Sequence, residues 1–276
     1  MGTLSAGSTA PPRNLVRLRE NYAPGWADDA VGTMARRTAR ERAAFFLPLL
    51  EPGMRVLDVG CGPGSITVGL AKTVGPQGEV VGVDMEPSQV AMARIAAERE
   101  QLANARFEVA SIYALPFTDA SFDAIFAHAV LEHLARPEAG LAELRRLLRT
   151  GGALGIADSN WREAVVEPRT PDVDLALASH FNLRRKAGGD PFAGERVPAL
   201  IKAAGFTDIA VTECDRADMS YDDLARYVSD RIEAALQGAE GSTQTELRQA
   251  ATAARRWTHQ RAGHFSQRWV LVTGRG

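Results

Sequence analysis

The sequence predicts a doubly wound α/β fold, in which helices cover both faces of a mostly parallel sheet. From residue 55 onward, short apolar stretches alternate with helical stretches. The apolar stretches have few polar interruptions, as expected for strands that are buried on both faces of a parallel sheet. A glycine-rich turn joins the first strand to the first helix, at the position where such folds often bind a ligand.

The residues before the first strand divide into two parts. Residues 1–14 are rich in Gly, Ser, Thr and Pro and have no hydrophobic period, so we expect a flexible arm. Residues 15–50 are expected to form a helical N-terminal cover. Apolar residues at helical spacing support this expectation: Ala39, Ala43, Phe46, Leu47 and Leu50.

The remaining elements follow in regular alternation. Strands are expected at 55–59, 79–84, 106–110, 123–127, 153–158, 208–213 and 269–274, with helices at 66–74, 87–102, 137–148 and 195–204. Two segments, 161–194 and 219–262, interrupt this order. Because insertions at the carboxyl ends of strands commonly form substrate lids, we expect residues 15–276 to be a single domain with two lid insertions.

The turn after the first strand carries the strongest chemical signal. Gly60, Gly62 and Gly64 are spaced G-x-G-x-G, and a helix follows at once, so the backbone can approach a ligand closely. The dinucleotide fingerprint has the wider spacing G-x-G-x-x-G, which argues against a nicotinamide oxidoreductase. Asp58 precedes the first glycine by two residues, where a carboxylate would repel a pyrophosphate but attract an ammonium group.

A second acid follows at the end of the next strand. Asp84 lies twenty residues after Gly64, where its carboxylate can accept two hydrogen bonds from a ribose diol. An acid for an ammonium group and an acid for a ribose together describe S-adenosylmethionine.

Three sequence motifs then indicate a protein family. Val56-Leu-Asp-Val-Gly-Cys-Gly-Pro-Gly64, Leu115-Pro-Phe with Ser121-Phe-Asp, and Val130-Leu-Glu-His-Leu134 occur in this order. The chain resembles the class I S-adenosylmethionine-dependent methyltransferases, in particular the small-molecule branch of ubiquinone/menaquinone-biosynthesis and sterol methyltransferases. The resemblance implies a Rossmann-like sheet of seven strands with the last one antiparallel, and a cofactor that lies across the carboxyl ends of the first four.

The resemblance also implies roles for residues around the glycine turn. The three glycines would line the methionine and ribose portion of the cofactor, and Asp58 would face its amino group. Asp84 would hold the ribose hydroxyls, and Met85 would pack on the adenine ring.

Further cofactor contacts are implied on the neighbouring strands. Ser111 and Ile112 stand at the adenine edge, where the family usually has an acidic residue, and a neutral hydroxyl is a weaker acceptor than a carboxylate. Ala127 and His128 would offer backbone carbonyls to the ammonium group. Arg37 either pairs with the cofactor's carboxylate or remains a solvated charge in a basic run.

Methyl transfer mainly requires alignment and exclusion of water, so a catalytic base is optional. If the acceptor must lose a proton, His133 is our first candidate for the base, followed by His128 and His180. The alternative is that His133 is a structural residue at the start of a helix.

The expected acceptor pocket combines acidic and aromatic side chains. Aromatic lid residues suit a flat or prenylated apolar acceptor that is methylated at carbon or oxygen, in specialised or quinone-like metabolism. Packing of each aromatic residue within the lid itself is the alternative for any one of them. The candidate pocket residues are Tyr22, Trp26, Asp158, Trp161, Phe181 and Tyr221.

Composition excludes several other classes. A formal net charge of −2 leaves no excess of positive charge for binding a nucleic acid. The Asn/Asp-Pro-Pro-aromatic motif of base-flipping enzymes is absent after the fourth strand. No pair of His or Cys residues has metal-ligand spacing, so no metal is expected. No apolar stretch reaches the roughly 20 residues of a membrane span. Cys61 and Cys214 make no disulfide framework, which fits a reducing cytoplasm.

Two further expectations remain open at this point. One is that the chain uses the bound cofactor structurally and catalyses a cyclisation or no reaction, because Ser111 departs from the family pattern and no catalytic residue is obligatory. The other is a homo-oligomer, suggested by the Ala/Arg-rich entry helix.

Overall fold

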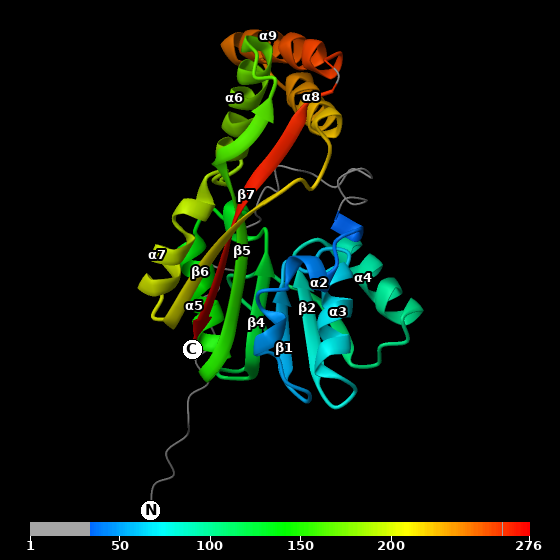
Figure 1. Cartoon of the computed structure of the whole chain (residues 1–276), viewed down its shortest axis with the longest axis vertical. Coiled ribbons are helices and arrows are strands. Elements are labelled where there is room, and N and C mark those ends of the chain that lie inside the picture. The colour runs from blue at the N-terminus through cyan, green and yellow to red at the C-terminus, as the bar shows by residue number, and fades with distance from the viewer. Residues whose placement is uncertain (1–33, 261) are drawn as a thin grey trace, which may run out of the picture.

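The structure is a computed structural model that describes residues 34–260 and 262–276, so the expected arm over residues 1–14 lies outside it. Seven strands form one sheet in the order β3-β2-β1-β4-β5-β7-β6, and β7 runs antiparallel between β5 and β6 (Figure 1). The predicted seven-stranded, mostly parallel fold is therefore confirmed. The strands are β1 (Arg55–Val59), β2 (Glu79–Asp84), β3 (Ala105–Val109), β4 (Phe122–His128), β5 (Leu148–Glu167), β6 (Thr207–Arg216) and β7 (His264–Arg275).

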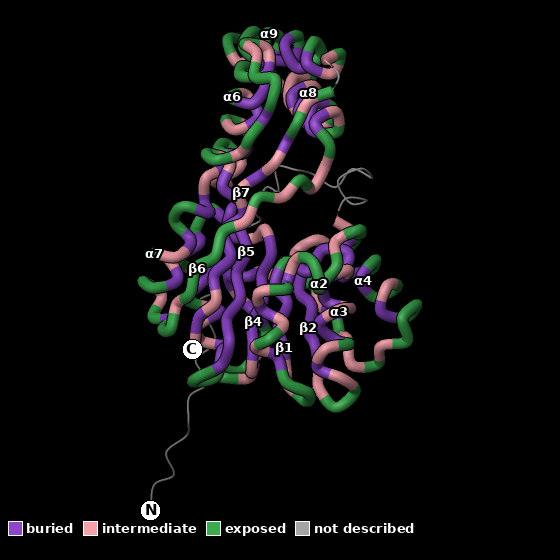
Figure 2. The backbone as a smooth tube through the Cα atoms, in the orientation of Figure 1, coloured by how far each residue is buried: buried purple, intermediate pink, exposed green. Residues whose placement is uncertain are grey.

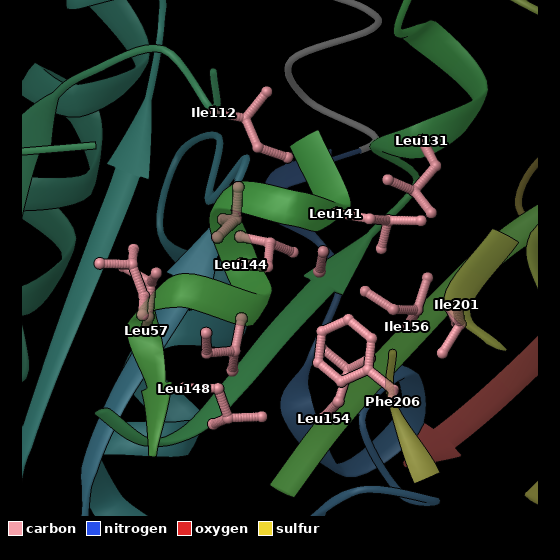
Figure 3. Close-up of a cluster of buried hydrophobic side chains, with 14 of the residues drawn as sticks. Leu57, Ile112, Leu131, Leu141, Leu144, Leu148, Leu154, Ile156, Ile201 and Phe206 are labelled. Atoms are coloured by element: carbon pink, nitrogen blue, oxygen red, sulfur yellow. The ribbon is translucent and has the colours of Figure 1, made fainter. Parts of the chain in front are cut away.

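Helices cover both faces of this sheet. On one face, α5 (Pro137–Leu147) and α7 (Val197–Ala203) cover the central strands, and Leu144 of α5 packs in the same core as Leu57 and Leu154 (Figure 3). On the other face, α3 (Ser65–Val74) and the N-terminal segment pack against β1, β2 and β4, while α4 (Pro87–Arg99) packs beside β3. The central strands β1, β2 and β4 are accordingly buried along most of their length, whereas the edge strands β3 and β6 are more exposed (Figure 2).

The end of the N-terminal cover departs from the predicted continuous helix. The structure has α2 (Ala39–Arg42) and a separate 3-10 turn, η1 (Leu47–Leu49). The chain turns at residues 43–46 between them, and Pro48, which lacks a backbone N–H, cannot donate the hydrogen bond that would continue an α-helix. Phe46 is nevertheless fully buried against Phe126 of β4. Of the residues at helical spacing, only Leu47 is half-buried, and the others are buried.

The fifth strand is much longer than predicted. We expected it at 153–158 and a lid from residue 161, but β5 continues to Glu167 and pairs with the start of β7 through Val166 and Phe265. Within residues 161–167 only Val166 is buried, and the polar stretch Asn160-Trp-Arg-Glu163 gives no apolar run to reveal a strand.

Three helices pack together at the outer ends of β5 and β7 (Figure 1). They are α6 (Pro171–Lys186), α8 (Tyr221–Gln237) and α9 (Gly241–Thr258), and we call them the helical cap. Thr170 caps α6 at its N-terminus, and Ser220 with Asp223 forms a capping box for α8. The cap has its own apolar core, in which Leu224 and Trp257 are fully buried. The predicted lid segments 161–194 and 219–262 thus supply one helical unit. Short turns η2 (Leu131–His133) and η3 (Ala193–Glu195) complete the described elements.

Candidate functional site

The glycine turn lies at the carboxyl end of β1, between that strand and α3. All three glycines have positive φ, at +67° for Gly60, +53° for Gly62 and +79° for Gly64. A Cβ on Gly64 would lie 2.9 Å from the backbone Cα of Ala93 in α4, whereas the nearest atom to a Cβ on Gly62 is 3.8 Å away. The absence of a side chain at Gly64 therefore allows α4 to pack closely against the turn. The absence of one at Gly62 leaves open space above the turn.

Asp58 and Asp84 stand near the carboxyl ends of the paired strands β1 and β2. One Asp58 oxygen accepts a hydrogen bond from Thr67 Oγ1 at 2.6 Å, and Asp84 accepts from the backbone N–H groups of Gly62 and Glu86, each at 2.9 Å. Burial, with a contribution from the charge of Asp84, raises the pKa of Asp58 to about 7 despite the Thr67 bond. Burial also raises the pKa of Asp84. Neither carboxyl group has a charged partner among residues 34–260 and 262–276, so a cationic ligand would stabilise them.

A cavity of about 640 Å³ opens above these strand ends. Gly64 and Ala127 lie outside its lining, and Ala127 is buried in β4. Tyr22 and Trp26, two expected pocket residues, lie outside the described residues. The other candidate cofactor residues all line the cavity: Arg37, Asp58, Gly60, Gly62, Asp84, Met85, Ser111, Ile112 and His128.

Arg37 has a protein partner in this structure. Its guanidinium lies 3.5 Å from Asp218 Oδ2, and Arg42 donates to the other oxygen, Asp218 Oδ1, at 2.5 Å. Asp218 precedes α8 of the cap and lines the same cavity as Arg37. These ion pairs connect the N-terminal cover to the cap beside the cavity.

The residues expected to form the acceptor pocket do not all line the cavity. Trp161 and His180 line the cavity, and Phe181 packs edge-on against Trp161 at 5.5 Å without lining it. Asp158 is completely buried below, where it accepts a hydrogen bond from the backbone N–H of Glu132 at 3.2 Å. Tyr221 lies in the core of the cap instead of the cavity wall, with its hydroxyl donating to the carbonyl oxygen of Pro168 at 3.2 Å.

A buried polar cluster at the cavity was missed from sequence. Glu132 Oε1 accepts a hydrogen bond from Arg184 Nη2 at 3.1 Å and lies 3.3 Å from His133 Nε2. Glu132 Oε2 accepts from the backbone N–H of Ser159 at 3.0 Å and from its hydroxyl. Burial would raise the pKa of Glu132, but the charges of Arg184 and His133 and the Ser159 bonds lower it. Glu132 belongs to the motif Val130-Leu-Glu-His-Leu134 and could have been recognised from it. No sequence motif around Arg184 marks that residue as part of the site.

All three candidate histidines line the cavity, and burial lowers the pKa of each. Burial, opposed by the charge of Glu132 and assisted by Arg184 and Arg37, lowers the pKa of His133 to about 4. Burial and the charges of Arg184 and Arg231 lower the pKa of His180 to about 3. Burial and the charges of Arg37, Arg42 and Arg216 also lower the pKa of His128, whose ring stacks on Trp269 with centroids 4.6 Å apart.

The described residues contain no group of three or more His, Cys, Asp or Glu side chains that could hold a metal ion. Within the same residues, no helix combines the length and apolar character that crossing a membrane requires.

A Rossmann-like sheet with a glycine turn and two acids at adjacent strand ends defines the class of S-adenosylmethionine-dependent methyltransferases. A family model described as "Methyltransferase domain" matches residues 50–186. An uncharacterized methyltransferase of Schizosaccharomyces pombe is 32% identical over 260 residues, covering 88% of this chain and 92% of that protein. The chain belongs to this methyltransferase family.

Two more distant similarities place this membership in context. A sterol 24-C-methyltransferase of Gibberella zeae is 38% identical over 174 residues, which are 59% of this chain and 43% of that protein. The crystal structure of the cyclase SpnF has 23% identity and a TM-score of 0.53, covering 87% of this chain and 84% of that chain. The second similarity shows a shared fold.

Proposed function

We propose that this enzyme transfers a methyl group from S-adenosylmethionine to a small, apolar or aromatic acceptor, at carbon or oxygen. One observation carries the proposal: the glycine turn and the aromatic side chains beyond it line the same cavity. Gly60 and Gly62 lie at one part of its wall, and Trp161, Tyr227 and Trp269 belong to another. A cavity of this size and lining suits a small organic molecule beside the cofactor.

The residues present fit the cofactor. When bound, S-adenosylmethionine supplies a methyl group that its sulfonium already activates for transfer. Asp58 would hold the amino group, because an ammonium ion would compensate the burial that now raises the pKa of this carboxyl. Asp84 would accept from the ribose hydroxyls, and Met85 would pack on the adenine ring beside Ser111 and Ile112.

We assign proton removal to His133. Its ring lines the cavity, and Nε2 lies beside Glu132 Oε1, so a hydrogen bond between them would hold the ring in one orientation. A neutral imidazole can accept a proton from a phenol, an enol or an acidic carbon as the methyl group is transferred. His128 supports the site differently, since its ring is stacked on Trp269.

The proposal is tested first by cofactor binding and then by turnover. Calorimetry should show S-adenosylmethionine binding that is weakened by Asp84→Ala. A panel of phenols, enols and prenylated quinols is then screened for release of S-adenosylhomocysteine. Binding of the cofactor without release for any acceptor would favour the alternative, a cyclisation or no reaction. Absence of cofactor binding would overturn the proposal altogether.

The setting of this reaction is part of the same proposal. The free thiols of Cys61 and Cys214 are consistent with a reducing cytoplasm, and the aromatic cavity with specialised or quinone-like metabolism. A homo-oligomer is also proposed, and light scattering that gives a monomer mass would contradict it.

A further inference from the structure

Two polar side chains of α6 lie at the cavity, one helical turn apart. His180 and Arg184 have the spacing i, i+4, so they occupy the same face of the helix. Both line the cavity, although the side chains are 98% and 96% buried. Charged and polar side chains are rarely buried to this extent unless they are paired.

Each of these side chains has a nitrogen that lacks a partner. Nδ1 of His180 and Nε of Arg184 are both buried and make no hydrogen bond within the described part of the chain. A buried polar nitrogen without a partner costs free energy that a ligand oxygen would recover on binding. These unmet groups therefore indicate a ligand atom at this position.

The nearby carboxylate of Glu132 does not accept a hydrogen bond from either of these nitrogens. Glu132 already accepts from Arg184 Nη2, from the Ser159 backbone N–H and from the Ser159 hydroxyl. The charges of Arg184 and Arg231 both lower the pKa of His180, so the positive potential of these arginines reaches its ring. The electrostatic environment therefore favours an incoming negative charge.

The surroundings of this pair are aromatic. The ring of His180 meets Tyr227 edge-on at 5.4 Å and Trp161 at 6.5 Å, and both of these residues also line the cavity. A flat apolar body could therefore pack beside the polar nitrogens.

We propose that His180 and Arg184 form a subsite that anchors the acceptor through an anionic oxygen, of which a carboxylate is the simplest form. This inference rests on the proposed function and narrows its acceptor to a flat apolar molecule that bears such an oxygen. His180 is then a binding residue, and proton removal is left to His133.

The experiment compares two probes of similar size that share a phenyl ring, one ending in a carboxylate and the other in a neutral hydroxyl group. Phenylacetate and 2-phenylethanol are titrated by calorimetry into the full chain saturated with S-adenosylhomocysteine. We expect phenylacetate to bind at least about tenfold more tightly, as a charge-assisted hydrogen bond would provide. Saturation with S-adenosylhomocysteine is measured beforehand, so a failure of cofactor binding is distinguished from a failure of the subsite.

Three variants separate the subsite from general damage. His180→Phe keeps an aromatic ring and removes both nitrogens, so it should abolish the preference for phenylacetate. His180→Asn keeps a polar atom at the position of Nδ1 and should retain most of it. Arg184→Lys keeps a cation for Glu132 but removes the Nε–H, and should reduce the preference. Unchanged thermal unfolding and S-adenosylhomocysteine affinity are required of each variant, and if Arg184→Lys fails this control the two His180 variants decide.

The opposite results are equally definite. Equal affinity for the two probes in the unmodified chain, or no binding of phenylacetate, would overturn the subsite. A preference that survives His180→Phe would overturn it as well.

Discussion

Arg184 Nη2 in the cap lies 3.1 Å from Glu132 Oε1 in the connection between β4 and α5, and both side chains are buried. The pair spans 52 residues of sequence and joins the cap to the sheet at the wall of the cavity. Removing two charges from water is costly, and here the Ser159 hydrogen bonds to Glu132 help to offset that cost.

Breaking this pair should destabilise the fold. Arg184→Met leaves the Glu132 carboxylate buried without its cation, so we expect the free energy of unfolding to fall by about 3–5 kcal/mol. Urea denaturation measures this change, and Arg185→Met, at the exposed neighbouring position, should change it by about 0.5 kcal/mol or less. Because the folded state lowers the pKa of Glu132 below 4.5, the pair's contribution should be complete above that pH and decline in stronger acid. Equal losses in the two variants would contradict this role.

Cofactor affinity should depend on the ionisation of Asp58. Its pKa is raised to about 7 in the free protein, whereas an ammonium group would favour the carboxylate. Affinity for S-adenosylmethionine should therefore rise between pH 5 and 7, by up to about tenfold per pH unit, with proton release on binding. Calorimetry in buffers of different ionisation enthalpy measures the affinity at each pH and the number of protons released on binding. The same raised pKa makes the free protein less stable as pH rises from about 4 to 7. Asp58→Asn should remove both dependences, and a flat affinity in the unmodified chain would refute the assignment.

Two glycines of one turn should respond differently to alanine. Gly64→Ala places a Cβ 2.9 Å from the Ala93 backbone at a positive φ, so we expect a loss of about 2–4 kcal/mol in unfolding free energy. Gly62→Ala meets no atom within 3.8 Å, and its positive φ should cost about 1–2 kcal/mol. Because Gly62 lines the cavity, its variant should instead weaken cofactor binding. Denaturation and calorimetry on both variants test the division, and the reverse order of stabilities would show that it is wrong.

Replacing His133 should affect turnover more than binding. If this imidazole accepts the acceptor's proton, His133→Ala should lower kcat by about 10²–10⁴ while S-adenosylhomocysteine affinity is retained. With a pKa of about 4, this group should cause no change in kcat between pH 6 and 8. The exposed His259 provides a control, since His259→Ala should leave kcat unaltered. Retention of full activity in His133→Ala would make this histidine a structural residue.

The residues proposed to hold the cofactor could be expected at one place because their signals are local. Gly60, Gly62 and Asp58 lie within a few residues of one another, and Asp84 ends the adjacent parallel strand. Parallel strands bring their carboxyl ends to one edge of the sheet, so residues at the ends of two predicted strands can be expected to lie close together.

The acceptor side could be predicted only in part, because His133, Trp161 and His180 were expected at the cavity but their polar neighbours were not. Glu132, Arg184 and Trp269 reach the cavity from η2, α6 and β7, which are distant in sequence. Tyr221 illustrates the limit, because helical spacing shows that a residue is buried but not which neighbour buries it.

The sequence by itself determined the sheet, the helices that cover it and the glycine turn with Asp58 and Asp84 at the strand ends, because burial periodicity and turn chemistry act over a few residues. The tertiary structure alone decided that β5 and β7 extend into a ribbon that carries the cap. It also decided that Arg184 and His180 of that cap meet Glu132 and His133 at one cavity, since such contacts depend on packing between elements and on the pairing of buried charges.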